Sequence, residues 1–191
     1  MLYKIAKILL KPFFFILYNI HVNGIENIPK PDGYIVCGNH TRALDPIILA
    51  LALPGQIHFM AKNELFKNRC LGALLNALGA YPIKRGEPDI KSIKTSLKLL
   101  QNNKNIGIFP EGTRNKTNEL KAEPGIAMLA IKSKTPILPV SIKTNYKLFN
   151  RTSIVIGEII CLDDFFDKKL KNDDYISISL DIMKKIKELQ E

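Results

Sequence analysis

A histidine and an aspartate that could act together in catalysis stand five positions apart in GNHTRALDP, residues 38–46. If the loop between them folds back, the Asp45 carboxylate can accept a hydrogen bond from Nδ1–H of His40. That bond would fix the imidazole tautomer, raise the basicity of Nε2 and stabilise the imidazolium. The same aspartate, followed by Pro46, is also typical of a helix N-cap, so a structural interpretation of Asp45 stays open. His40 has no such explanation, because its place after a predicted buried strand is neither core nor cap.

Three further polar breaks follow apolar runs: YPIKRG at 81–86, FPEGTRNK at 109–116 and ILPVS at 137–141. The glutamate, glycine, threonine and arginine of the second break can supply a hydroxyl, free backbone N–H groups and a guanidinium fork. Together these groups suit a phosphate monoester. The proline in the third break predicts a sheet edge or a bend near a site. Taken singly, each basic break is better explained as an ordinary solvated loop.

Strand-length apolar runs alternate with stretches of helical periodicity along the chain, and this alternation predicts an α/β domain. In such domains functional residues gather in the loops at strand ends. No internal repeat or linker divides the chain, and 191 residues are enough for one substantial core. We therefore expect a single domain with a central, mostly parallel or mixed sheet flanked by helices. The expected strands are 34–37, 57–61, 106–109, 137–142 and 154–160, and the expected helices are 45–53, 64–78, 90–100, 124–132 and 174–191, the last capped by Asp174.

The chain carries 28 Lys and Arg against 18 Asp and Glu, a formal net charge of +10, so an anionic partner is expected. Nucleic acid, an anionic membrane surface and a phosphorylated substrate all fit this charge, although no nucleic-acid-binding module is recognisable. Cys37, Cys70 and Cys161 lie far apart among apolar neighbours, which favours core positions in a reducing compartment over disulfides. No Cys/His spacing typical of a metal site occurs, so no metal is expected.

Residues 1–22, MLYKIAKILLKPFFFILYNIHV, combine lysines with large apolar side chains. A membrane-spanning helix needs about 20 apolar residues, and the charge-free run at 12–18 is much shorter. No signal-peptide cleavage site follows it. The pattern favours an amphipathic helix in the interface of an anionic membrane, with 13–15 as an apolar wedge; a helix packed on its own domain is the alternative. We divide the chain into a membrane-associating segment, 1–22, and a folded domain, 23–191.

Taken together and in this order, the four polar segments resemble the motifs of the bacterial-type 1-acyl-sn-glycerol-3-phosphate acyltransferases. This family belongs to the wider glycerolipid acyltransferase superfamily. NHTRALDP is similar to the family's His-x4-Asp (HX4D) motif, YPIKRG to its second block with an arginine, FPEGTRNK to its third block and ILPVSI to its proline block. Matching segments extend over residues 20–145. FPEGTR downstream of NHxxxxD is a highly specific combination.

The resemblance implies an O-acyltransferase of phospholipid biosynthesis that forms no acyl-enzyme. His40 would be the general base that takes the proton from the sn-2 hydroxyl of 1-acyl-sn-glycerol 3-phosphate, and Asp45 would orient His40. The alkoxide would then attack an acyl thioester, giving phosphatidic acid. The residues implied in binding the glycerol phosphate are Arg85, Glu111, Gly112, Thr113 and Arg114, with Arg114 as the main phosphate partner.

The implied acyl donor is a thioester of acyl-carrier protein or coenzyme A, with no metal or other cofactor. The leucine-rich stretch 64–78 would line an acyl-chain groove or pack in the core. We expect a peripheral protein on the cytoplasmic face of the cell membrane. An acyltransferase for glycerol 3-phosphate or another lysophospholipid is an alternative, because Arg42 stands where the family usually has serine. A non-catalytic protein that binds anionic phospholipid is a further alternative, against which the intact His40 and Asp45 pair argues.

Overall fold

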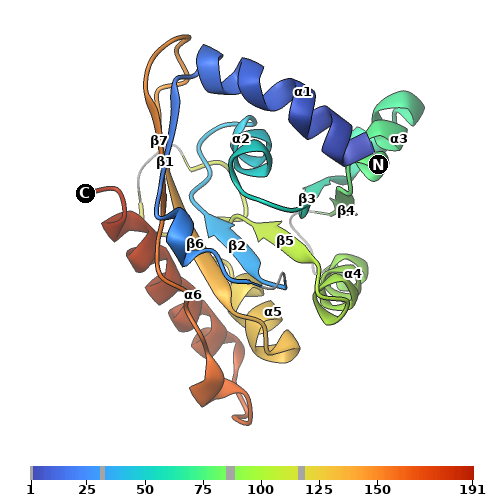
Figure 1. Ribbon diagram of the computed structural model, residues 1–191. Coiled ribbons are helices and arrows are strands. Elements are labelled where there is room, and N and C mark those ends of the chain that lie inside the picture. Colours follow the sequence, from blue (N-terminus) through green and yellow to red (C-terminus); the bar gives the residue numbers. More distant parts are fainter. Residues whose placement is uncertain (1, 31–32, 85–88, 116–118) are drawn as a thin grey trace.

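The computed structural model describes residues 2–30, 33–84, 89–115 and 119–191. Seven strands of these residues form one sheet in the order β1-β7-β6-β2-β5-β3-β4 (Figure 1). Neighbouring strands run parallel, except that β7 is antiparallel to β6. The strands are β1 (Ile20–Asn23), β2 (Ile35–Gly38), β3 (Ile57–Lys62), β4 (Tyr81–Ile83), β5 (Asn105–Ile108), β6 (Ile137–Lys143) and β7 (Thr152–Ile156).

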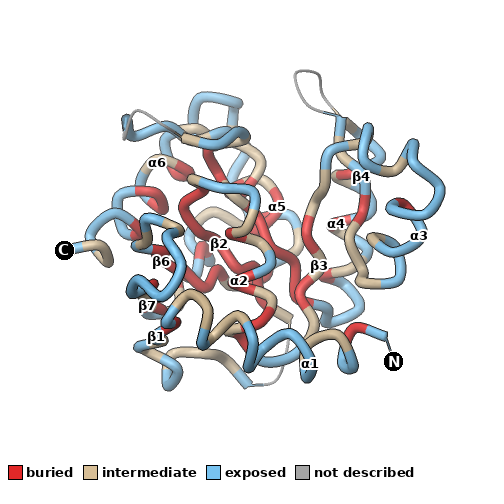
Figure 2. The backbone as a smooth tube through the Cα atoms, turned by 90° about the horizontal axis from the view of Figure 1, so that it is seen from above, coloured by how far each residue is buried: buried red, intermediate tan, exposed pale blue. Residues whose placement is uncertain are grey.

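The central strands are buried on both faces, as expected where helices cover both sides of a parallel sheet (Figure 2). Tyr34 and Val36 belong to one hydrophobic cluster, whereas Ile35 and Cys37 belong to the other. Helices α1 and α2 cover the first face, and α4, α5 and α6 cover the second (Figure 1). The helices are α1 (Leu2–Leu17), α2 (Asp45–Ala52), α3 (Arg69–Ala77), α4 (Ile90–Gln101), α5 (Gly125–Ser133) and α6 (Asn172–Glu188).

The predicted α/β domain with a mostly parallel, mixed sheet is confirmed, and the five predicted strands correspond to β2, β3, β5, β6 and β7. The sequence did not predict β1 and β4, which lie at the two edges of the sheet. They are only four and three residues long, too short for an alternating pattern to be recognised. Among the described residues, no helix is both long enough and apolar enough to cross a bilayer.

The predicted helix over 64–78 is wrong in its first part. The chain there forms a 3-10 turn, η2 (Asn63–Phe66), and α3 begins only at Arg69. Asn68 separates the two elements, because its backbone is extended and its side-chain oxygen accepts a hydrogen bond from Leu71 N at 3.0 Å.

The last helix also begins earlier than predicted. Helix α6 starts at Asn172, so Asp174 lies within its first turn instead of at its N-cap. The Asp174 carboxylate accepts a hydrogen bond from Lys171 N at 2.7 Å. An acidic side chain in the first turn of a helix is favourable at either position, so composition alone did not fix the boundary.

The predicted sheet edge at Pro139 is wrong, because β6 is an interior strand between β2 and β7. Ile137 N donates to Ile160 O, so Pro139, two residues further on, faces the same neighbouring chain. That neighbour continues past Ile156, and Gly157 N donates to Pro139 O at 2.9 Å. Pro139 therefore lacks only the return hydrogen bond that an N–H at this position would donate, a loss limited to one bond of the ladder.

Gly107 in β5 leaves room for the ring of Phe59 in the neighbouring strand β3. A β-carbon on Gly107 would lie 2.1 Å from Cε1 of that ring. Phe59 in turn stacks beside Phe109, with ring centroids 5.9 Å apart and an interplanar angle of 16°. The glycine thus lets an aromatic side chain lie across the sheet at the end of β5, where the candidate site begins.

Candidate active site

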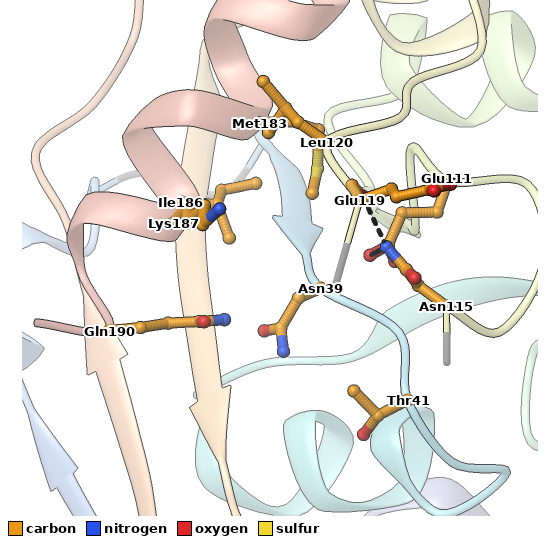
Figure 3. A pocket seen from close by; sticks show the side chains of 10 residues that line it. All are labelled: Asn39, Thr41, Glu111, Asn115, Glu119, Leu120, Met183, Ile186, Lys187 and Gln190. Atoms are coloured by element: carbon orange, nitrogen blue, oxygen red, sulfur yellow. Dashed lines mark hydrogen bonds between the residues drawn. The ribbon is translucent and has the colours of Figure 1, made fainter. Parts of the chain in front are cut away.

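The candidate site lies where β2 and β5 end side by side. The two strands are parallel neighbours, so the segments that follow them, 39–46 and 109–115, meet at one edge of the sheet. Asn39 and Thr41 from the first segment share a cavity with Glu111 and Asn115 from the second (Figure 3). Motifs far apart in the chain are therefore neighbours in the fold.

His40 and Asp45 form the hydrogen bond that their spacing predicted, with 2.8 Å between Nδ1 and Oδ2. Both residues are buried, with exposed fractions of 6% for His40 and 0% for Asp45. When Nδ1 carries the proton and donates it to the carboxylate, Nε2 of the neutral ring is the acceptor. No side chain of the described ranges hydrogen-bonds to Nε2, so this atom is available to accept a proton from a substrate.

Asp45 does not cap α2 as its sequence context suggested. The helix begins at Asp45 itself, and no side chain caps its N-terminus. Oδ2 of Asp45 instead accepts the upstream backbone N–H groups of Thr41, at 2.7 Å, and Arg42, at 2.8 Å. The carboxylate thus closes the loop between the two ends of the motif, which brings His40 within reach.

The imidazole of His40 stacks on Phe109, with ring centroids 4.2 Å apart and an interplanar angle of 21°. Phe109 follows β5, and its other neighbour in the stack is Phe59. The stack restrains the plane of the imidazole, and the bond to Asp45 restrains its rotation within that plane. A base held in this way needs little reorganisation before it accepts a proton.

Glu111 ties the two loops together. Its Oε2 accepts the backbone N–H of His40 at 2.6 Å, and its Oε1 accepts Nδ2 of Asn115 at 3.2 Å. Asn115 N also donates to His40 O at 2.8 Å, so the backbone of His40 is held at both polar groups. Burial raises the pKa of the Glu111 carboxyl, and the hydrogen bond from His40 N opposes this rise. Glu111 therefore holds the loops, and the substrate contact implied by the resemblance stays a prediction.

Most of the residues expected to bind phosphate share this loop. Gly112 adopts a left-handed backbone with φ of 68°, and its N–H donates to Phe109 O at 3.1 Å. Thr113 and Arg114 follow and are exposed, and Arg114 forms no ion pair with any residue of the described ranges. Arg85 lies outside the described residues. Within those ranges, no group of three or more His, Cys, Asp or Glu side chains could hold a metal ion.

A polar cavity of about 200 Å³ lies on the α6 side of the first loop (Figure 3). Asn39 continues the pairing of β2 with β6 past the strand end, because its amide donates to Ile142 O at 2.9 Å and accepts from Ile142 N at 2.7 Å. Lys187 of α6 and Gln190, just after that helix, contribute to the opposite wall. Since successive side chains alternate, Asn39 lines this cavity while His40 faces Asp45 on the other side of the loop.

A second cavity, of about 400 Å³, is apolar and lies between α1, α2, α3 and β3. Ala43 and Pro46 line one part of it, so the cavity reaches the His-x4-Asp segment. Part of the leucine-rich stretch 64–78 lines it as well. The lining leucines of that stretch are Leu65, Leu75 and Leu78, whereas Leu71 and Leu74 do not line it and are exposed.

Comparison with known proteins decides the family. A model of the family described as Acyltransferase matches residues 19–143. The chain belongs to the acyltransferase family. The 1-acyl-sn-glycerol-3-phosphate acyltransferase of Bacillus subtilis is 34% identical over 170 residues, which are 86% of this chain and 85% of the relative. The enzyme of the same name from Streptococcus pneumoniae is 36% identical over 126 residues, which are 64% of this chain but only 47% of that relative.

The fold agrees with that of a solved structure. The crystal structure of the 1-acyl-sn-glycerophosphate acyltransferase of Thermotoga maritima shares the fold, with a TM-score of 0.71 over 98% of this chain and 78% of that one. Its sequence identity is 24%. The chain is therefore an O-acyltransferase, as its motifs predicted. The family match ends at residue 143, before the loop between β6 and β7.

Replacing Glu111 by alanine should destabilise the acyltransferase by about 1–3 kcal/mol, because the buried N–H of His40 and the Asn115 amide lose an acceptor. The free energy of unfolding can be measured by urea titration. Glu123→Ala is the matched control, since Glu123 also lies between β5 and α5 but is exposed. Equal stability of the two variants would contradict the loop-holding role of Glu111.

Proposed function

We propose that this O-acyltransferase transfers a fatty acyl group from a thioester to the sn-2 hydroxyl of 1-acyl-sn-glycerol 3-phosphate, giving phosphatidic acid in phospholipid biosynthesis. The observation that carries the proposal is the buried hydrogen bond between His40 and Asp45, with Nε2 of His40 unengaged by the described side chains. Such a pair supplies a general base for a hydroxyl nucleophile. The relatives from Bacillus subtilis and Streptococcus pneumoniae are named for this acceptor, which supports the proposal.

In the proposed reaction, Nε2 of His40 takes the proton of the sn-2 hydroxyl as its oxygen attacks the thioester carbonyl carbon. A C–O bond forms, and the carbonyl oxygen becomes the oxyanion of a tetrahedral intermediate. That intermediate collapses with cleavage of the C–S bond. The imidazolium then returns its proton to the departing thiolate, so the products are the ester and a free thiol. Asp45 stabilises the imidazolium between the two proton transfers.

The head group of the acceptor would be bound by the loop after β5. Arg114 offers an exposed guanidinium, which can pair with a phosphate through two parallel hydrogen bonds. Thr113 offers a backbone N–H group and a hydroxyl in the same turn, next to Gly112, whose own N–H is used within the loop, and Arg85 would add a second cation. The negative charge of a bound phosphate would thus be met by cations while the hydroxyl is held near His40.

The apolar cavity is suited to a fatty-acyl chain, since most ligand pockets for such groups are concave and lined by hydrocarbon side chains. Its contact with Ala43 and Pro46 would bring one end of a bound chain to the catalytic loop. The thioester could be supplied by acyl-carrier protein or by coenzyme A, because the reacting C–S bond is the same in both.

One face of α1 supports attachment to a membrane. Its exposed apolar side chains recur at helical spacing and are between 44% and 71% exposed; they are Leu2, Ile5, Leu9, Phe13 and Ile16. The other face packs on the domain, where Tyr3 OH donates to Ala50 O of α2 at 3.3 Å. The exposed face therefore fits a helix in a membrane interface, and the opposite face fits a helix packed on its own domain.

The lysines of α1 are not equivalent. Lys4 and Lys11 are exposed between the packed face and the apolar stripe formed by those five side chains, and they suit anionic head groups. Lys7 instead turns inward and donates to Leu53 O and Gly55 O at the end of α2. Burial lowers the pKa of Lys7 to about 8. We propose that residues 1–22 hold the enzyme peripherally on the cytoplasmic face of an anionic membrane through the apolar stripe and the two exposed lysines.

His40→Ala should lower kcat for acyl transfer to 1-acyl-sn-glycerol 3-phosphate by about 10²–10⁴-fold, because the general base is lost. Transfer can be followed by release of the free thiol from acyl-coenzyme A or acyl-carrier protein. Circular dichroism of the variant should match that of the parent enzyme. Full activity in the folded variant would overturn the mechanism.

The acceptor can be tested with a panel of glycerol 3-phosphate, 1-acyl-sn-glycerol 3-phosphate and other lysophospholipids, each with both donors. The highest kcat/KM is expected for 1-acyl-sn-glycerol 3-phosphate. A higher value for another acceptor would replace the proposed substrate but keep the reaction. Binding of anionic phospholipid without any transfer would support the non-catalytic alternative.

Arg114→Ala should raise KM for the acceptor by about tenfold and leave kcat within about threefold, because a pairing that is equal in ground and transition states is lost. Steady-state kinetics at saturating donor measures both constants. Lys98→Ala is the control, since it removes one exposed positive charge on α4. An unchanged acceptor KM would refute the phosphate role of Arg114.

Replacing Leu9 and Phe13 together by serine should lower the partition coefficient onto anionic vesicles by more than about tenfold, because each side chain contributes about 1.5–3 kcal/mol when fully buried. Both are exposed, so the fold should be unaffected. Sedimentation with vesicles measures the partition. Ile25→Ser, an exposed apolar residue outside α1, should leave it unchanged. Equal sedimentation of all variants would favour the view that α1 only covers its own domain.

A further inference from the structure

Tyr146 contacts the catalytic pair from a part of the chain that no motif covers. It lies in the loop between β6 and β7, beyond residue 143 where the family match ends. Its hydroxyl donates a hydrogen bond to Oδ1 of Asp45. This is the carboxylate oxygen that His40, Thr41 and Arg42 do not use, since all three donate to Oδ2.

The loop holds Tyr146 in a conformation that ordinary side chains avoid. Its φ is 59°, in the left-handed region, which is unfavourable for a residue with a β-carbon unless surrounding contacts compensate. Tyr146 N donates to Thr144 Oγ1 at 3.0 Å, and that oxygen is 2.8 Å from Thr152 Oγ1 at the start of β7. The base of the loop therefore sets the direction in which the phenol points.

The end of α1 supports the same side chain. The ring of Tyr18 meets that of Tyr146 edge-on, with centroids 6.1 Å apart and an interplanar angle of 74°. Tyr18 also contacts Phe14 of α1, at 5.7 Å between centroids. Phe149 N donates to Leu17 O at 2.7 Å, which joins the loop to the last turn of the helix. A chain of aromatic contacts thus runs from α1 to the hydroxyl that reaches Asp45.

A fully buried carboxylate needs donors on both oxygens, because each unsatisfied lone pair in a dry site is unfavourable. Within the described ranges, Tyr146 is the donor recorded for Oδ1 of Asp45. Burial and the charge of Asp45 raise the pKa of the Tyr146 phenol well above its ordinary value, so it stays protonated and remains a donor.

We infer that Tyr146 is a positioning residue of this acyltransferase, which orients the Asp45 carboxylate so that His40 is held as the base. It acts through Asp45 and does not touch the reacting atoms. The inference rests on the proposed function, in which His40 takes the proton of the acceptor hydroxyl. It assigns a catalytic support to the β6–β7 loop, which the family motifs leave without a role.

Tyr146→Phe tests this inference, because it removes the hydroxyl and keeps the ring that packs on Tyr18. We expect kcat to fall about tenfold while KM for both substrates stays within about twofold, since a hydrogen bond to the base-orienting carboxylate is lost. Tyr175→Phe is the matched control, because Tyr175 is also partly buried but packs on the opposite face of the sheet. A wild-type kcat for Tyr146→Phe, or a fall explained by loss of folded protein in circular dichroism, would overturn the inference.

A double-variant cycle shows whether Tyr146 acts through Asp45. In an Asp45→Asn background, adding Tyr146→Phe should cause no further fall in kcat. A second tenfold fall would mean that the tyrosine acts by another route, and the inference would be wrong.

An NMR measurement that needs no substrate can test the positioning role of Tyr146 separately from the proposed acyl-transfer reaction. In NMR spectra of the imidazole nitrogens, assigned with His40→Ala, the parent protein should show the Nδ1–H tautomer of His40. Tyr146→Phe should exchange that proton with water at least about tenfold faster, because the carboxylate is less restrained. Unchanged exchange would overturn the positioning role even if the enzyme used another acceptor. Absence of any acyl transfer by the parent protein would overturn only the proposed function.

Discussion

The site depends on one buried charge, the carboxylate of Asp45. A charge removed from water is strongly unfavourable unless hydrogen bonds replace its hydration. Here the replacement comes from two backbone N–H groups, the imidazole of His40 and the phenol of Tyr146. The segment 40–42 and the β6–β7 loop must therefore both adopt the positions that satisfy this one side chain. The local fold and the geometry of the catalytic pair are consequences of the same set of hydrogen bonds.

The sheet extends this constraint to the second loop. Because β2 and β5 end together, Glu111 can accept the N–H of His40 and Phe109 can stack on its ring. The position of Phe109 depends in turn on Phe59, and that of Phe59 on the absence of a side chain at Gly107. His40 is therefore held at its backbone N–H by Glu111, at Nδ1 of its ring by Asp45, and on the face of its ring by Phe109. Loops that carry function are ordinarily mobile, and here the restraints come from buried or half-buried groups next to the ends of two strands.

Features that depend on local pattern could be predicted from the sequence, and contacts between distant segments could not. Buried parallel strands have no polar face, so apolar runs located five of the seven strands, and the spacing of His40 and Asp45 predicted their contact. The leucine pattern continues through the 3-10 turn before Asn68, which hid the interruption of the predicted helix. The sequence did not predict a role for Tyr146, because its partner Asp45 lies in another loop. A single sequence does not show which loops are in contact.

The register of the first strand has a consequence for the order in which the chain is assembled. β1 has one neighbour in the sheet, β7, and Ile20 pairs with Thr152 near the other end of the chain. A ribosome synthesises the N-terminal helix first, yet the strand that ties it to the sheet emerges among the last. Pairings between such distant segments form late, because closing a long loop costs conformational entropy before the favourable contacts between the strands can form. Until residue 152 has been synthesised, β1 therefore lacks its strand partner, and the exposed apolar side chains of α1 are present before the β6–β7 loop and β7 complete the active site.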